Sequence, residues 1–180
     1  MYRIGFLFAG TLALRPQAQE FWRKLREPGN AVRVLLAERA AQSLGIQVRS
    51  FPVRASEELK PVLNKAFEEH VGALLAEGDA LIFDRRADVI AFSLANRIPT
   101  FHNWPEEAID GAVAAYGSEL ADEYRRAAFY VGKILAGAAP ADLPVDQAAH
   151  FQFVLNMKTA KAIGLKVPDS ILLRADKVIE

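Results

Sequence analysis

Short apolar runs alternate with amphipathic segments along most of the 180-residue chain. Several runs are apolar at consecutive positions, as is typical of strands that are buried on both faces of a parallel sheet. The segments between them repeat apolar residues every three or four positions, which predicts helices. Strands that alternate with helices predict an α/β fold with three layers, in which a mostly parallel sheet lies between helices. The predicted strands are Ile4–Ala9, Ile46–Val53, Val71–Ala76, Ile98–His102, Ala112–Tyr116 and Phe151–Leu155.

Small polar residues and glycines mark the ends of the predicted helices. The clearest helix follows Ser118, whose hydroxyl is expected to cap it, and stops at Gly137. Its acidic residues come early and its basic residues late, as the helix dipole favours. Ser56 and Asn156 are expected to cap two other helices in the same way. Further helices are predicted over residues 16–27, 31–44, 78–96 and 171–179, with an extended crossover over 138–146.

Composition excludes several classes of function. The 22 Lys and Arg residues balance 22 Asp and Glu residues, so the chain has no overall attraction to nucleic acid or to an anionic membrane. It has no cysteine, which excludes a disulfide framework, a thiolate zinc site and a cysteine nucleophile. No apolar run approaches the roughly 20 residues that cross a bilayer. Residues 1–12 are not typical of a signal peptide, so we expect a cytoplasmic protein or a mature form without its leader.

The loops that follow the strands are the candidate ligand site, because doubly wound sheets bind ligands beyond the carboxyl ends of their strands. Trp104 and Tyr116 are expected to stack on a planar organic ligand. Smaller or polar residues in the same loops are expected to supply the remaining contacts. These ligand-binding candidates are Gly10, Thr11, Ser56, Asp79 and Asn103.

Cofactor and catalytic motifs are absent from these loops. The loop after the first strand has neither the dinucleotide nor the phosphate-loop glycine spacing, so no cofactor is predicted. His70, His102 and His150 show no metal-ligand spacing, so no metal is predicted. His102 follows a strand and is placed to act as a base, although no nucleophile motif accompanies it. Binding without catalysis is the simpler interpretation, and a small α/β enzyme that uses His102 is the alternative.

The C-terminal part of the chain closely resembles the end of ABC-transporter substrate-binding proteins of the tryptophan/tyrosine-uptake type. The resemblance extends more weakly back to about Ala31 and includes Arg3–Leu7 at the start. The blocks that carry it occur in the family's order. They are Tyr116-Gly117, Tyr124–Ala128, Lys133–Gly137, Pro140–Val145, Asn156–Leu165 and Arg174–Glu180.

This resemblance implies a periplasmic-binding-protein fold of type I, with two α/β lobes and a small ligand in the cleft between them. Such proteins are exported or anchored to the membrane. They deliver a small organic ligand, often an aromatic amino acid, to an ABC permease and catalyse no reaction. Closure of the two lobes couples binding to delivery.

The chain is shorter than the members of this family, and Pro28-Gly29-Asn30 leads almost at once into what resembles lobe two. We therefore expect residues 1–29 and 112–140 to form a remnant of lobe one. Residues 30–111 and 141–180 are expected to form a nearly complete lobe two. Uncovered strand edges pair with other chains, so a homodimer or a swapped homo-oligomer is expected. A truncated relative with a structural or regulatory role, and without transport, is the alternative function.

Overall fold

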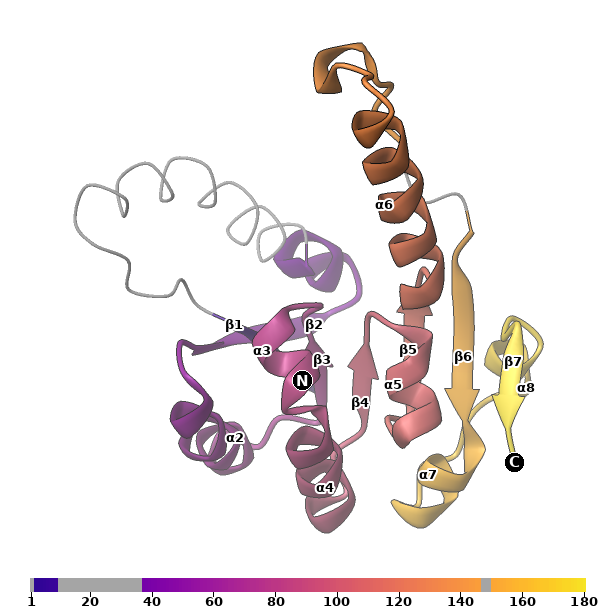
Figure 1. Cartoon of the computed structure of the whole chain (residues 1–180). Helices are drawn as coiled ribbons and strands as arrows, with labels where there is room; N and C mark the ends of the chain where they lie inside the picture. Colours follow the sequence, from indigo (N-terminus) through magenta and orange to yellow (C-terminus); the bar gives the residue numbers. More distant parts are fainter. Residues whose placement is uncertain (1, 10–36, 147–149) are drawn as a thin grey trace.

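In the computed structural model, which describes residues 2–9, 37–146 and 150–180, one seven-stranded sheet forms the centre of the fold (Figure 1). The order of the strands is β2-β1-β3-β4-β5-β6-β7. Strands β1 to β5 are parallel, β6 is antiparallel to β5, and β7 is parallel to β6. The predicted α/β class with a mostly parallel sheet is thus confirmed. The strands are β1 (Tyr2–Ala9), β2 (Ile46–Val53), β3 (Ala73–Ala76), β4 (Thr100–His102), β5 (Ala114–Gly117), β6 (Gln152–Asn156) and β7 (Lys177–Ile179).

The helices follow the strands as the alternation predicts. Residues 37–43 are helical, and this segment ends at Gly45, whose φ of +66° suits glycine. Among the described residues no helix combines the length and the apolarity needed to cross a membrane. The remaining helical segments are η1 (Ser56–Glu58), α2 (Leu59–Glu68), α3 (Ala80–Asp84), α4 (Arg86–Asn96), α5 (Pro105–Asp110), α6 (Leu120–Leu135), η2 (Pro140–Asp142), α7 (Met157–Ala162) and α8 (Asp169–Leu172).

One of the three predicted caps is confirmed, and two are wrong. The side chain of Asn156 accepts the backbone N–H of Thr159 at 3.0 Å, so it caps α7 as expected. Helix α6 begins one residue later than predicted, because the hydroxyl of Ser118 donates to Glu123 instead of accepting a backbone N–H. Ser56 is the first residue of the η1 turn and does not cap it.

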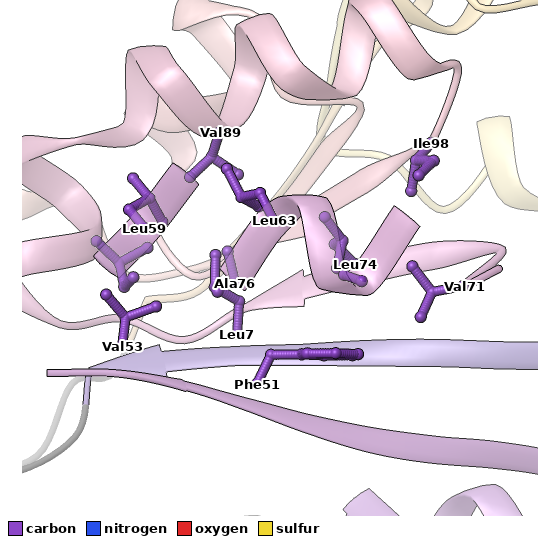
Figure 2. Close-up of a cluster of buried hydrophobic side chains, with 12 residues drawn as sticks. Leu7, Phe51, Val53, Leu59, Leu63, Val71, Leu74, Ala76, Val89 and Ile98 are labelled. Carbon is purple, nitrogen blue, oxygen red and sulfur yellow. The ribbon is translucent and has the colours of Figure 1, made fainter. Parts of the chain in front are cut away.

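The main core lies between the β1–β3 part of the sheet and the helices that cover one of its faces. Figure 2 shows Leu7 and Leu74 from the strands beneath Leu63 of α2 and Val89 of α4. All four side chains are at most 3% exposed. Full burial of a side chain of this size contributes about 1.5–3 kcal/mol. The core therefore fixes β3, whose carboxyl end carries one loop of the candidate site.

The predicted helix over residues 171–179 is wrong. Helix α8 ends at Leu172, and the chain then turns and continues as strand β7 beside β6. Asp176 forms this turn, since its N–H donates to the carbonyl of Phe153 at 2.8 Å and its carboxylate accepts the N–H of Phe153 at 2.7 Å. The predicted helix over 78–96 is likewise two helices, which are separated at Arg85.

The sheet joins strands that the predicted division assigns to different lobes. Strand β1, assigned to a remnant of lobe one, pairs with both β2 and β3, and β5 pairs with β4 and β6. Both strands therefore belong to the same sheet as the strands assigned to lobe two, because backbone pairing continues across them. Residues 10–29 lie outside the described residues, so the rest of that assignment stays a prediction.

Helix α6 is the described element that extends furthest from the sheet (Figure 1). It leaves the carboxyl end of β5, and none of its residues is buried. The chain then returns to the sheet as β6, so α6 and the residues after it form an excursion between two neighbouring strands.

Candidate functional site

Three loops meet at the carboxyl edge of the sheet, after β3, β4 and β5. Asn103 lies between two glycines there. A Cβ atom on Gly78 would lie 3.0 Å from the Cβ of Asn103, and a Cβ on Gly117 would overlap the carbonyl oxygen of Asn103. Only glycine permits so close an approach at Gly117. We call the five residues Gly78, Asp79, Asn103, Trp104 and Gly117 the edge site.

The indole of Trp104 is held by its neighbours. Its ring meets the ring of Phe83 edge to face, with the centroids 5.1 Å apart and an angle of 84° between the planes. The guanidinium of Arg86 lies 4.3 Å from the centroid of Phe83, and its Nε donates to the carboxylate of Asp110 at 2.6 Å. Trp104 nevertheless stays partly exposed, so a face or edge of the indole is open to a ligand.

A buried pair beneath the edge site fixes the loop after β4. Nδ1 of His102 lies 2.8 Å from Oε1 of Glu107, and Oε2 of Glu107 accepts the backbone N–H of Trp104 at 3.1 Å. His102 is 1% exposed and Glu107 is 2% exposed. No described residue bonds to Nε2 of His102. The imidazole is thus engaged inside the fold, which favours a structural role over that of a base.

The start of α6 is tied to the same edge. Oε1 of Glu106 in α5 accepts the backbone N–H of Leu120 at 3.0 Å. Nε2 of Gln152 in β6 donates to Oε1 of Glu119 at 2.7 Å. These two bonds anchor the first turn of α6, so the direction of the helix depends on residues beside the edge site.

Among the predicted site residues, Asp79, Asn103 and Trp104 are brought together. Asp79 also caps α3, because its Oδ1 accepts the N–H of Leu81 at 2.8 Å. Gly10 and Thr11 lie outside the described residues.

Two predicted residues lie apart from this group. Ser56 follows β2, which is separated from β4 by β1 and β3. Tyr116 is adjacent to Ala115, which pairs with His102, so its side chain points to the face of the sheet opposite the side chain of His102. There it stacks on Phe151 with the ring centroids 5.7 Å apart. Each of the two rings expected to hold a planar ligand thus packs against a different aromatic ring, Trp104 against Phe83 and Tyr116 against Phe151.

Sequence reasoning missed Gly78, Gly117 and Glu107. A signal for Glu107 was present, because Pro105 at the first helical position and Glu107 at the third are typical of a helix start where the carboxylate reaches back to the cap. The glycines gave no comparable signal, because their contacts join different loops. Among the described residues, no three His, Asp or Glu side chains are grouped to hold a metal ion.

A hollow of about 270 Å³ lies beside strands β3 to β6, against the segment after α7. Pro99, Phe101 and Phe153 are among its lining residues, which are mostly apolar. Ligand sites combine apolar walls with a few converging polar groups that fix orientation. The edge site has such groups, so we take it as the candidate ligand site.

Solved structures with the same fold come from several bacteria. The chain has 22% identity and a TM-score of 0.79 to an ABC domain in complex with L-Trp from Streptococcus pneumonia, covering 99% of this chain and 55% of that chain. It has 21% identity and a TM-score of 0.78 to a conserved domain protein from Vibrio cholerae, covering 98% of this chain and 54% of that chain. It has 18% identity and a TM-score of 0.61 to a ligand-free, open substrate binding protein with adhesive properties from Clostridium difficile. That match covers 99% of this chain and 54% of that chain. The chain thus spans about half the length of these structures. No curated protein matches its sequence.

The sheet and its covering helices define an α/β unit of the periplasmic-binding-protein class. The chain belongs to the ABC transporter substrate binding protein family, whose model matches residues 26–179. Family members bind solutes without catalysis and are typically periplasmic or extracellular.

Proposed function

We propose that this chain is the solute-binding component of an ABC-type importer, or a part of it, and that it binds an aromatic amino acid or a similar small organic ligand. It acts without catalysis. The permease of the importer is its membrane partner, and the periplasm is its place of action. Family membership supports solute binding, and the L-Trp bound by the pneumococcal relative supports an aromatic ligand.

The observation that carries this proposal is the amide of Asn103, which has no hydrogen-bond partner among the described residues. Asn103 is half-buried where three loops meet. A half-buried amide has lost part of its water and gains from a partner. Beside it, Trp104 offers a partly exposed ring that is fixed by Phe83. A ligand satisfies both residues when its aromatic ring lies against Trp104 and one of its polar groups hydrogen-bonds to the amide of Asn103.

Replacing Asn103 by alanine is expected to weaken binding of the ligand about tenfold, since one hydrogen bond of this kind is worth roughly 1.4 kcal/mol. Isothermal titration calorimetry with L-Trp, L-Tyr and L-Phe measures the affinity. Asn64→Ala is the matched control, because Asn64 lies exposed on α2. The control is expected to bind like the unchanged protein.

Two results contradict the proposal. One is the absence of binding for all three amino acids at millimolar concentration while the protein is folded. The other is equal affinity in Asn103→Ala and Asn64→Ala, which places the ligand away from the edge site.

A structural or regulatory role without transport is the second candidate function. The exposed helix α6 favours it, because an amphipathic helix without buried residues indicates an interaction with another protein surface. Retention of L-Trp binding together with a negative result for permease association supports this second candidate over the first.

A further inference from the structure

One wall of the hollow beside strands β3 to β6 is apolar and comes from a single face of the sheet. Phe101 follows the residue that pairs with Leu74 of the main core, so its side chain points away from that core. Phe101 pairs with Ala114, and Ala114 pairs with Leu155, so these three side chains share one face. Phe153 stacks on Phe101 with the ring centroids 6.3 Å apart. All four residues line the hollow.

The other wall comes from the chain after α7. Residues 165–168 and Ile171 of α8 line the hollow on this side. Backbone hydrogen bonds hold both ends of the segment. The N–H of Leu165 donates to the carbonyl of Ala160 at 2.8 Å, and the N–H of Ile171 donates to the carbonyl of Pro168 at 2.9 Å. The hollow is therefore bounded by two walls that the fold holds in place.

The hollow and the edge site lie at opposite ends of the strands. Thr100 and Ala114, the first residues of β4 and β5, line the hollow, whereas the edge site follows the carboxyl ends of these strands. In Figure 1, α6 leaves the upper end of β5, and α7 follows the lower end of β6. Residues 10–36 join β1 to the helical segment before β2, at the side of the sheet away from β6. The hollow is thus separate from the edge site and from the carboxyl edge where the chain leaves the sheet.

A basic side chain lies at the opening of the hollow. Lys166 is exposed and lines the hollow, and among the described residues it has no ion-pair partner, although Asp169 follows closely in the sequence. Residues 157–180 hold five basic and three acidic residues in a chain that is neutral overall. A lysine stem lies along apolar surface while its ammonium stays in water. The hollow thus combines apolar walls with one cation at its opening, which suits a molecule with an apolar body and one carboxylate.

We propose that this hollow binds a small monocarboxylate with an apolar body, of the size of 3-phenylpropionate. The volume of about 270 Å³ fits a ring with a short chain, since an apolar cavity of roughly 150 Å³ holds benzene. The apolar body lies against Phe101 and Phe153, and the carboxylate pairs with Lys166. The bound molecule joins the sheet to the segment before α8. This proposal does not depend on the ligand of the edge site.

Nuclear magnetic resonance of the full chain tests the site, with 3-phenylpropionate as the probe. We expect a dissociation constant of roughly 1 mM, as suits a ligand of this size. The backbone N–H signals of Phe101, Phe153 and residues 165–171 are expected to shift, whereas the signal of Asn103 is not. The uncharged amide 3-phenylpropanamide has the same shape and is the matched control. It is expected to bind about threefold more weakly, because an exposed ion pair contributes modestly.

Two variants with matched controls test the two parts of the site. Lys166→Gln is expected to weaken binding of the acid about threefold and to leave binding of the amide unchanged. Lys161→Gln is its control, because Lys161 is exposed on α7 and does not line the hollow. Phe101→Ala is expected to weaken binding of both probes about tenfold, because it removes part of the apolar wall. Phe67→Ala is its control, since Phe67 is 49% exposed on α2 and Phe101 is 38% exposed.

Competition with L-Trp separates this site from the edge site. Saturating L-Trp and the Asn103→Ala variant are both expected to leave the affinity for 3-phenylpropionate unchanged. If L-Trp does not bind, the proposed function fails, and the affinity for 3-phenylpropionate still tests the hollow. The proposal is overturned by the absence of binding at millimolar concentration, by loss of binding in Asn103→Ala or under L-Trp, or by equal affinity for the acid and the amide.

Discussion

Gly117→Ala is expected to destabilise the protein by about 2–3 kcal/mol, the range of severe overpacking, and to abolish ligand binding at the edge site. The added methyl group overlaps the carbonyl oxygen of Asn103, which is backbone and has no alternative rotamer. Either β5 or the loop after β4 must move, and both carry the site. Urea unfolding gives the change in stability, and calorimetry with L-Trp gives the change in binding.

Gly132→Ala is the control, and its effect has the opposite sign. Gly132 lies inside α6 with open space around its Cα, so alanine is expected to stabilise the helix by about 0.5–1 kcal/mol. The same chemical change thus destabilises at one position and stabilises at the other. Equal stability of Gly117→Ala and the unchanged protein contradicts the close packing of the three loops.

The strands were predictable because their signals are local. Ile46–Val53 was predicted with the bounds that the structure shows, since it lies between a glycine stop and a polar helix start. The helix end at Gly137 was also predictable, because its φ of +99° is a conformation that side chains avoid. Such features depend on neighbouring residues alone.

Contacts between distant parts of the chain were not predictable in this way. The three residues Lys177–Ile179 look helical in sequence, but they form β7 because β6 and Asp176 offer backbone partners. The position of β1 in the sheet likewise depends on contacts with distant parts of the chain. A short apolar run fits any parallel sheet, and only its pairing with β2 and β3 decides to which sheet it belongs.

The candidate site shows the same limit. Strand alternation indicates that Tyr116 and Ala115 point to opposite faces, but sequence does not tell which face the ligand uses. The meeting of Gly78, Asn103 and Gly117 is a property of three neighbouring strands. Hence the loops of the site were predictable, whereas the residues that join within it were not.

Glu107→Ala is expected to destabilise the protein by about 3–5 kcal/mol, the range for breaking a buried polar pair. Its two oxygens engage Nδ1 of His102 and the N–H of Trp104, and all of this lies beneath the edge site. The truncation leaves both groups without a partner in a region that excludes water. Urea unfolding measures the loss.

Two variants separate the buried pair from helix α5 in general. Asp110→Ala removes a carboxylate of the same helix that pairs with Arg86 at the surface, so its cost is expected to stay below about 1 kcal/mol. Glu107→Gln keeps the shape and an oxygen that accepts the N–H of Trp104, so it is expected to recover part of the lost stability.

The fluorescence of Trp104 distinguishes a local effect from a global one. The chain has two tryptophans, so Trp22→Phe leaves Trp104 as the only one. In that background, Glu107→Ala is expected to shift the emission of the folded protein to longer wavelength, because the released loop exposes the indole to water. Asp110→Ala is expected to leave the spectrum nearly unchanged. If the Glu107→Ala protein is destabilised but its spectrum is unshifted, the His102–Glu107 pair supports the core without positioning Trp104. The geometry of the loop then comes from the packing of Asn103 between its two glycines.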